Sequence, residues 1–195
     1  MGGLTARLAS RNAHKLAELK TALPEWEVEL LDADGFPPED GPTYYDNARA
    51  KARFGRRVEG ADVWILGEDS GIEAAGLDGR PGPGSARYAQ PGEDPVEKLL
   101  RELEGIEGDG RRARYVCELV SVSPQLEEFR GTGTLEGRIA GAPRGSEGFG
   151  YDPIFIPEGE TRTVAELGNA WKAENSHRAR AARALVAAVG DGVDS

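Results

Sequence analysis

The chain has 195 residues, with 34 acidic and 24 basic side chains and a formal charge of −10 at pH 7. This length predicts one domain, or two lobes sharing one core, that folds without a disulfide or metal. The acidic excess argues against non-specific binding to nucleic acids or anionic membranes, because both attract basic surfaces. A single cysteine, Cys117, excludes an intrachain disulfide and a cysteine-based zinc site.

The chain carries no sequence signal for a membrane or for secretion. Its longest unbroken apolar run, residues 184–189, is too short to span a bilayer. The N-terminal region has no apolar core of a signal peptide. We therefore expect a cytoplasmic protein with no membrane partner and no nucleic-acid partner.

Apolar periodicity predicts strands and helices that alternate along the chain, which is typical of an α/β fold. Thr43 and Asp46 have the spacing of a helix-capping pair, and Asp94 followed by Pro95 is a typical helix start. The predicted strands are 4–10, 26–31, 63–66, 113–123 and 128–135, and the predicted helices are 13–23, 43–58, 94–105 and 176–189. Glycine-dense stretches at 67–92 and 141–159 are predicted loops, where α/β proteins carry functional side chains.

Several common signatures of nucleotide-binding and hydrolytic proteins are absent. The sequence has no Gly-Lys pair and hence no Walker A loop, and it has no Gly-x-Gly-x-x-Gly. It also has no Gly-x-Ser-x-Gly and no His-Glu-x-x-His. Any activity must therefore rest on a different set of residues.

Lysine and histidine are scarce, with five and two residues against 19 arginines, and three lysines and both histidines fall in short polar segments. Lys15 follows Ser10 and Asn12 at the predicted start of the first helix. Donors beside a helix N-terminus can cradle a phosphate, although the same residues are also typical of a plain capped helix. Asn47 and Lys51 are four residues apart and should share one helical face.

Two adjacent carboxylates, Glu68 and Asp69, follow the predicted strand at 63–66 and precede Ser70. Carboxylates in this position can hold Mg²⁺ or accept a proton from water, although an Asp-Ser pair also suits a simple turn. Glu39 offers a further carboxylate in a proline-rich loop.

Two later segments have side chains suited to a nucleobase. The stretch Gly-Phe-Gly-Tyr-Asp-Pro at 148–153 places aromatic rings beside flexible backbone, which suits stacking on a base or a turn with buried rings. Lys172 and the run Ser-His-Arg at 176–178 form a group of donors that could read a keto oxygen or simply begin a basic helix.

The order of these motifs resembles the inosine triphosphate pyrophosphatase family, which acts on non-canonical purine nucleoside triphosphates. The resemblance runs from Leu8 to about Arg178, nearly the whole chain. Its motifs are Ser10-x-Asn12-x-x-Lys15, Glu39-x-Gly41 with Asn47-Ala48 and Lys51-Ala52, Glu68-Asp69-Ser70-Gly71, Ser85-Ala86-Arg87-Tyr88, and residues 148–153 with Lys172 and Ser176-His177-Arg178. Three positions depart from the pattern of many members: Arg11 replaces a glycine, Glu68 replaces an aspartate, and Asn175 stands where a small apolar residue is common.

The resemblance implies an α/β fold with a mixed, long-stranded sheet in two lobes, flanking helices and a nucleotide cleft between the lobes. It implies one pyrophosphatase domain over residues 1–195, a homodimer, and Mg²⁺ as cofactor. The implied reaction is hydrolysis of ITP, dITP and XTP between the α and β phosphates, giving a monophosphate and pyrophosphate and cleansing the nucleotide pool.

The resemblance also implies site residues. Asp69 is expected to be the general base, and Glu39 and Asp69 are expected to bind the metal, with Glu68 as a further candidate. The expected substrate-binding residues of the first half are Ser10, Arg11, Asn12, Ala13, His14, Lys15, Lys51 and Ser70, with Ser10, Asn12, Lys15, Lys51 and Ser70 on the phosphate side. The residues expected to hold the base are Phe149, Gly150, Tyr151, Asp152, Lys172, His177 and Arg178.

Two alternatives stay open. A Maf-type nucleotide pyrophosphatase shares the broad fold and an opening motif similar to Leu8-Ala9-Ser10, and it would prefer modified pyrimidine or other triphosphates. A non-catalytic nucleotide-binding module would bind without cleavage, although such a module needs no general base like Asp69.

Overall fold

The computed structural model describes residues 4–60 and 62–193, and over these ranges the chain forms a six-stranded sheet in the order β2-β1-β3-β4-β5-β6. Parallel pairing joins β1 to β2 and to β3, and antiparallel pairing joins β5 to β6, so the sheet is mixed as predicted. The strands are β1 (Leu4–Leu8), β2 (Trp26–Leu30), β3 (Trp64–Ala74), β4 (Arg112–Val122), β5 (Glu128–Ile139) and β6 (Phe155–Pro157). The predicted domain limits at residues 1 and 195 lie outside the described residues.

Helices flank the sheet, as expected for an α/β fold. In the described part of the chain they are α1 (Ala13–Ala22), α2 (Tyr44–Val58), α3 (Pro95–Glu102), α4 (Val164–Asn175) and α5 (His177–Val193). Short 3₁₀ turns are η1 (Ala75–Leu77), η2 (Gly82–Arg87), η3 (Gly108–Arg111) and η4 (Asp152–Ile154). None of the helices within the described ranges is long and apolar enough to cross a membrane.

The chain divides into two compact units, each with its own buried apolar side chains. Unit 1 comprises Met1–Asp69, Cys117–Gly133 and His177–Ser195, and unit 2 comprises Ser70–Val116 and Thr134–Ser176. The two lobes that the family resemblance implies correspond to these units.

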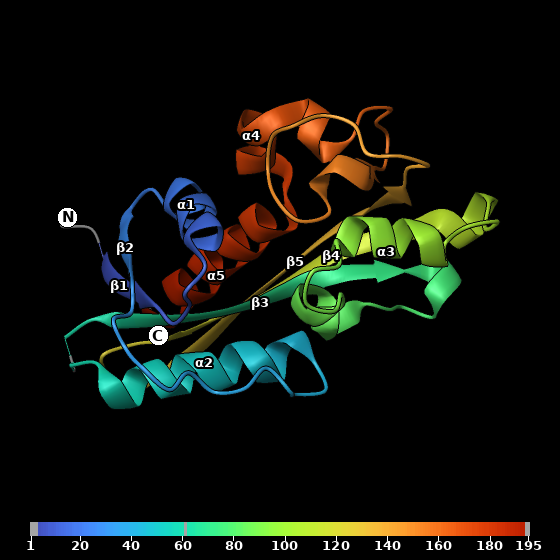
Figure 1. Cartoon of the computed structure of the whole chain (residues 1–195). Helices are drawn as coiled ribbons and strands as arrows, with labels where there is room; N and C mark the ends of the chain where they lie inside the picture. Colours follow the sequence, from blue (N-terminus) through green and yellow to red (C-terminus); the bar gives the residue numbers. More distant parts are fainter. Residues whose placement is uncertain (1–3, 61, 194–195) are drawn as a thin grey trace. The chain divides into compact units, whose positions relative to one another are not determined.

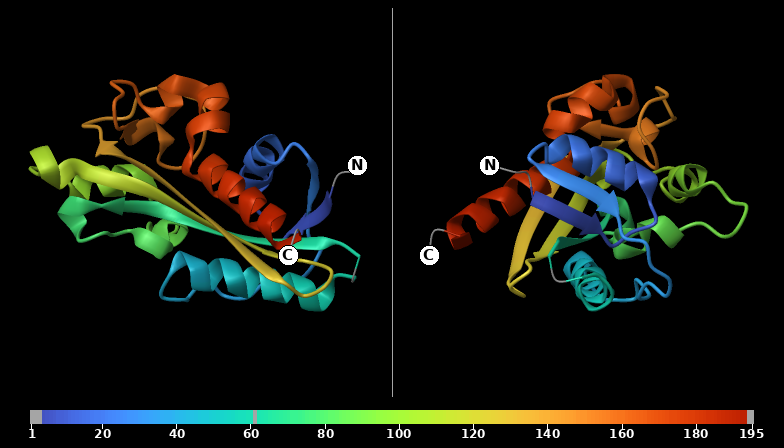
Figure 2. Two further views of the ribbon diagram at one scale, coloured as in Figure 1. Left: turned by 180° about the vertical axis from the view of Figure 1, so that it is seen from behind. Right: turned by 90° about the vertical axis from the view of Figure 1, so that its left-hand side faces the viewer.

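In unit 1, α1 packs against β2 and against α5, although α5 is more than 150 residues away along the chain. Figure 1 and the view from behind in Figure 2 both show α1 and α5 side by side. Leu8, Leu19 and Leu185 are fully buried in the core that these elements share. This packing brings the starts of α1 and α5 into one unit.

The prediction of a loop beginning at Gly67 is wrong, because β3 continues without a break to Ala74. A Cβ atom at Gly67 would lie 2.0 Å from the carbonyl oxygen of Ala48 and 2.6 Å from the amide nitrogen of Ala52. The glycine is therefore required by the close approach of α2 to the strand rather than by a turn. Glu68 and Asp69 consequently lie within a strand.

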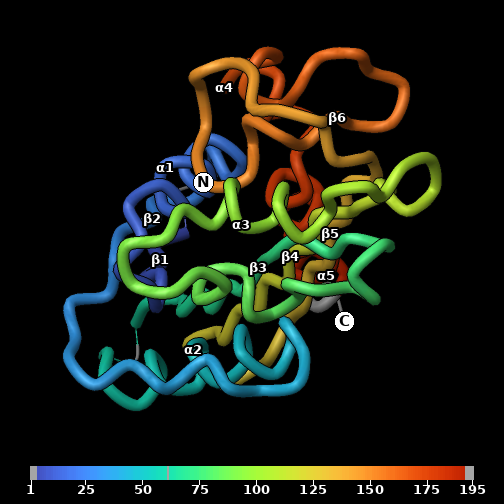
Figure 3. Tube along the Cα trace, turned by 45° about the vertical axis from the view of Figure 1, so that its right-hand side comes forward, coloured from blue at the N-terminus to red at the C-terminus, as the bar shows by residue number. Residues whose placement is uncertain are grey.

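In unit 2, β6 and α4 occupy a region in which no strand or helix is predicted from the sequence. Figure 3 shows β6 beside α4, and α4 also packs against η4. The strand has only three residues, and Gly168, at φ 87°, interrupts the helical backbone of α4. These two features remove the periodicity on which the sequence prediction depends.

We predict that Gly67→Ala lowers the free energy of unfolding by about 3 kcal/mol, because the added methyl group would overlap backbone atoms of α2. Chemical denaturation followed by circular dichroism measures the change. Gly60→Ala is the matched control in the same unit, since no atom lies within 4 Å of the place its methyl group would take and the substitution should be nearly neutral. Equal stability of the two variants would contradict the close-packing argument.

Candidate active site

The centre of the site in unit 1 is the carboxylate of Glu68, which is 0% exposed. The ammonium nitrogen of Lys15, from α1, lies 2.6 Å from Oε2. The guanidinium of Arg178, from α5, donates to Oε1 from Nη2 at 2.8 Å and from Nε at 3.2 Å. Arg178 also contacts Glu18 of α1 through Nη1. Glu68 therefore ties the starts of two helices to β3.

The charges in this group support one another. Burial alone would raise the pKa of Glu68, but Lys15 and Arg178 hold it well below its usual range. Burial alone would lower the pKa of Lys15 and of Arg178, but Glu68 raises both above their usual values. The carboxylate and both cations are therefore charged at neutral pH.

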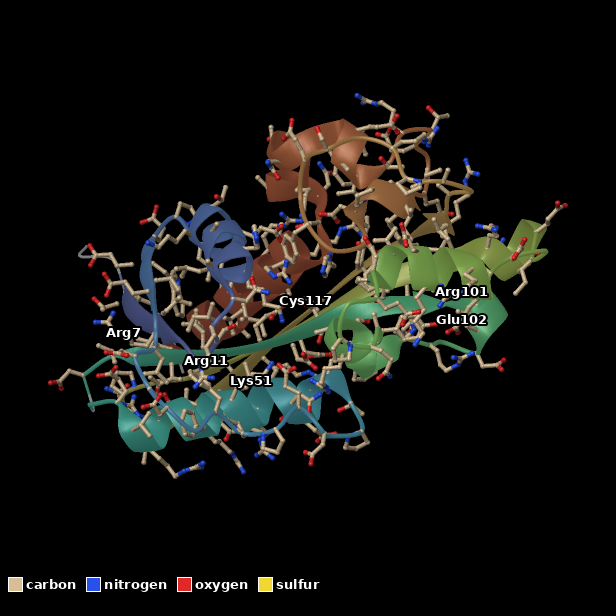
Figure 4. The ribbon with its side chains drawn as sticks, viewed as in Figure 1. Arg7, Arg11, Lys51, Arg101, Glu102 and Cys117 are labelled. Carbon is tan, nitrogen blue, oxygen red and sulfur yellow. The ribbon has the colours of Figure 1, made fainter. Side chains whose placement is uncertain are left out.

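Cys117 on β4 lies in the same buried region, and its Sγ is 3.5 Å from Oε1 of Glu68. Burial, followed by the negative charge of Glu68, raises the pKa of the thiol well above its usual value. Cys117 belongs to unit 1 and is labelled in Figure 4. The cysteine is thus a protonated, buried side chain and not a nucleophile.

Asp69 is held by two side chains of α2. Asn47 donates from Nδ2 to Oδ2 at 2.9 Å, and Nζ of Lys51 lies 3.5 Å from Oδ1. Lys51, labelled on α2 in Figure 4, also donates to the backbone oxygen of Glu68 at 2.9 Å and contacts the carboxylate of Glu39. The prediction that Asn47 and Lys51 share one helical face is confirmed, because both reach the same aspartate.

Asp69 has an electrostatic setting different from that of Glu68. Burial raises its pKa above the usual value, although Lys51 and Asn47 act in the opposite direction. Its contacts are a neutral amide and a single ammonium group at 3.5 Å, whereas Glu68 has a close ammonium group on Oε2 and two guanidinium nitrogens donating to Oε1. Of the two adjacent carboxylates, Asp69 is therefore the one suited to exchange a proton, whereas Glu68 is fixed as an anion.

The segment before α1 uses its polar side chains to shape the helix start. Oδ1 of Asn12 accepts from the amides of His14 and Lys15, at 2.9 and 3.1 Å, and Oγ of Ser10 accepts from the amide of Asn12. Arg11 is exposed, with its guanidinium 5.1 Å from the ring centre of Phe36. Ala13 and His14 are also exposed, on the first turn of α1.

Arg11 adopts an ordinary backbone conformation, although many bacterial members of the family that the sequence resembles have glycine at this position. Among the described residues, the non-glycine positions with positive φ are Asp78 and Leu126. The loop at Arg11 therefore needs no glycine.

In unit 2 the sequence-predicted base-binding residues gather around Asp152. Lys172 donates to its Oδ2 at 2.6 Å, and the amide of Phe149 donates to the same oxygen at 2.8 Å. The ammonium nitrogen of Lys172 lies 4.7 Å from the centre of the Phe149 ring. Tyr151 is buried, and its hydroxyl donates to the carbonyl of Ser85 at 3.0 Å, so its ring is pinned inside the unit.

The remaining predicted residues divide between the two units. Ser70 and Gly150 belong to unit 2, and His177 is the buried first residue of α5 in unit 1. The family resemblance predicts Arg178 among the base-binding residues, whereas in the structure its guanidinium forms buried ion pairs with Glu68 and Glu18.

The carboxylates around Asp69 are the side chains of this site that could bind a metal ion. Glu39 and Asp69 both contact the ammonium group of Lys51, so their hard oxygen donors converge on one point. Within the described ranges no group of three histidine, cysteine, aspartate or glutamate side chains forms a metal cage. Two carboxylates fit Mg²⁺, which usually binds one or two carboxylates together with phosphates and water. Glu68 is paired with two cations, Lys15 and Arg178, whereas Glu39 and Asp69 share the ammonium group of Lys51, so Glu68 fits this role less well.

Comparison with known proteins identifies the family. A family model described as the Ham1 family matches residues 6–188. The chain belongs to the Ham1 family. A dITP/XTP pyrophosphatase of Bdellovibrio bacteriovorus is 44% identical over 188 residues, which cover 92% of this chain and 94% of that relative. A dITP/XTP pyrophosphatase of Thermus thermophilus is 39% identical over 196 residues, covering 97% and 94%. The solved Ham1 protein of Staphylococcus aureus has a TM-score of 0.82 at 34% identity, covering 97% of this chain and 99% of that one.

Two residues of this Ham1 site are absent from the sequence-predicted set. Asn47 holds Asp69; its four-residue spacing from Lys51 places it on the right helical face, but the sequence pattern assigns it no role in the site. Glu18 pairs with Arg178, but its partner is 160 residues away, so only its position one turn after Lys15 could have indicated it.

We predict that Glu68→Gln lowers the free energy of unfolding by about 3–5 kcal/mol, because it leaves the buried Arg178 and the partly buried Lys15 without their shared carboxylate. Urea denaturation measures the change. Glu29→Gln is the matched control, since Glu29 pairs with Arg7 at 2.9 Å on the surface and solvent screens that pair. If Glu68→Gln were as stable as the control, Glu68 would not have the anchoring role assigned to it.

Proposed function

We propose that this protein hydrolyses dITP, ITP and XTP to a nucleoside monophosphate and pyrophosphate, and so cleanses the nucleotide pool. The observation that carries the proposal is the carboxylate of Asp69, held on β3 by Asn47 and Lys51 beside Glu39. The Bdellovibrio and Thermus relatives are dITP/XTP pyrophosphatases and are aligned over nearly the whole chain, which supports the same substrate class.

Asp69 is the proposed general base. Hydrolysis adds water across the anhydride between the α and β phosphates, so one proton of the attacking water must be accepted as that bond breaks. Asn47 and Lys51 fix the carboxylate that would take this proton. Lys51 and Lys15 would offset the charge of the phosphates, and Ser10, Asn12 and Ser70 complete the proposed phosphate side.

Mg²⁺ is the proposed cofactor, and Glu39 and Asp69 would hold it. When bound, Mg²⁺ neutralises phosphate charge and polarises the phosphoryl oxygens. The chain itself favours a cation here: Glu18, Glu39, Glu68 and Asp69 outnumber Lys15, Lys51 and Arg178 by one charge. A triphosphate would meet a net negative group without added positive charge.

Base recognition is assigned to the residues gathered around Asp152. Lys172, anchored on Asp152, can donate to the 6-keto oxygen of hypoxanthine or xanthine, and an adenine amino group would leave that donor unpaired. The ring of Phe149 can stack on the base, with Gly150 and Tyr151 shaping the segment. His177 and Arg178 are also proposed as base-site residues. The guanidinium of Arg178 is held by its ion pairs with Glu18 and Glu68.

The broader assignments are also proposals. The protein is a homodimer, acts in the cytoplasm, and has one pyrophosphatase domain over residues 1–195. The nucleotide is its partner, with no nucleic acid or membrane involved. The Maf-type and non-catalytic alternatives are separated from this proposal by the experiment that follows.

We predict that the protein, incubated with Mg²⁺ and a panel of triphosphates, releases pyrophosphate from dITP, ITP and XTP and acts far more slowly on ATP and GTP. Pyrophosphate and orthophosphate are measured separately, with a chelator in parallel reactions that should abolish release. Orthophosphate as the first product would refute cleavage between the α and β phosphates. Preference for a pyrimidine would favour the Maf-type alternative, and binding without turnover would favour the non-catalytic one.

We predict that Asp69→Asn lowers kcat for dITP by at least about a hundredfold while the nucleotide still binds, because the amide keeps the shape of the side chain but cannot accept the proton. Single-turnover assays and calorimetry with dITP measure the two effects. Asp109→Asn, at an exposed aspartate paired with Arg112, is the control and should keep full activity. Near-normal turnover of Asp69→Asn would refute the assigned base.

A further inference from the structure

The hydroxyl of Tyr115 is a buried polar group that the proposed mechanism does not use. Tyr115 lies on β4 in unit 2 and is 6% exposed. Its ring packs against that of Phe155 with 4.5 Å between ring centres. Its hydroxyl donates to Oδ1 of Asp152 at 3.2 Å, and Asp152 itself is 3% exposed. A strand of the sheet thus reaches the residue on which base recognition is centred.

Three donors in unit 2 approach the two different oxygens of the Asp152 carboxylate. Lys172 and the amide of Phe149 both donate to Oδ2, whereas Tyr115 donates to Oδ1. Two donors on one oxygen fix that oxygen but still allow the group to tilt about it. The third contact, on the other oxygen, fixes the plane of the carboxylate. Because Tyr115 sits on a sheet strand, its contact is the one made from a rigid element.

The carboxylate of Asp152 in turn holds the ammonium group of Lys172, and the plane of that carboxylate sets the direction of the Oδ2 lone pairs to which Lys172 donates. That ammonium group is held at 2.6 Å from Oδ2 and 4.7 Å from the centre of the Phe149 ring. A donor that distinguishes a keto oxygen from an amino group must be held in place, since a mobile one can turn away from the wrong base at little cost.

We propose that Tyr115 is a positioning residue for base selection, which acts through Asp152 to fix Lys172 against the ring of Phe149. The inference rests on the proposed function, because it takes Lys172 and Phe149 as the groups that contact the base. Tyr115 touches neither the phosphates nor the reacting water in this assignment. Its loss should therefore affect binding of the base and leave the chemical step intact.

The test is Tyr115→Phe, which keeps the ring and its packing on Phe155 and removes only the hydroxyl. Calorimetry measures the affinity for IMP, which carries the base, and for inorganic pyrophosphate, which does not. We expect IMP to bind about tenfold more weakly and pyrophosphate to bind within about twofold of the unmodified protein, since a hydrogen bond to a charged group is lost only on the base side. In steady-state assays KM for dITP should rise similarly, with kcat nearly unchanged.

Tyr88→Phe is the matched control, because the Tyr88 hydroxyl also donates to a carboxylate of unit 2, that of Glu102 on α3. It should leave both affinities unchanged, and thermal melting confirms that both variants are folded. Unchanged binding of IMP by Tyr115→Phe would overturn the inference, and equal weakening for IMP and pyrophosphate would show a general structural role instead. Failure of the unmodified protein to release pyrophosphate from dITP would be a failure of the proposed function, and it is read from a separate assay.

Discussion

The arrangement of unit 1 depends on one buried anion, the carboxylate of Glu68. A fully buried carboxylate is costly unless it is paired and hydrogen-bonded, and Lys15 and Arg178 meet that requirement from two helices far apart in the sequence. The pairing also acts in the other direction, because Glu68 offsets the burial of both cations and raises the pKa of Lys15 and of Arg178. The position of α1 and of the start of α5 relative to β3 is thereby fixed by charge as well as by apolar packing.

The strand geometry explains why two adjacent carboxylates have different roles. Successive side chains of a strand point to opposite faces of the sheet, so Glu68 and Asp69 contact different helices. Glu68 meets α1 and α5, whereas Asp69 meets Asn47 and Lys51 of α2. Gly67 allows α2 to approach closely enough for this second set of contacts. One face of the strand thus anchors the unit, and the other presents the carboxylate proposed to act on water.

Features that depend on residues close together in the sequence, such as helix caps and helical faces, are predicted from the sequence. The cap at Thr43, the helix opened by Asp94 and Pro95, and the shared face of Asn47 and Lys51 follow from spacing alone. The pairing of Glu68 with Arg178 does not, because its partners are 110 residues apart and no period connects them. Gly67 shows the opposite error: a glycine required by a neighbouring helix has the same sequence pattern as a turn.

The whole chain and the group of charged side chains around Glu68 and Asp69 are both net negative. The chain carries −10, and the group around Glu68 and Asp69 also has one more carboxylate than cations. A site for a polyanion alone would need the reverse balance. A site for a triphosphate that arrives with a divalent cation does not, since the cation converts the local excess from negative to positive. Lys15 and Lys51 each hold a carboxylate in place, which accounts for their low exposure in an acidic protein, and in the proposed function they would also face the phosphates.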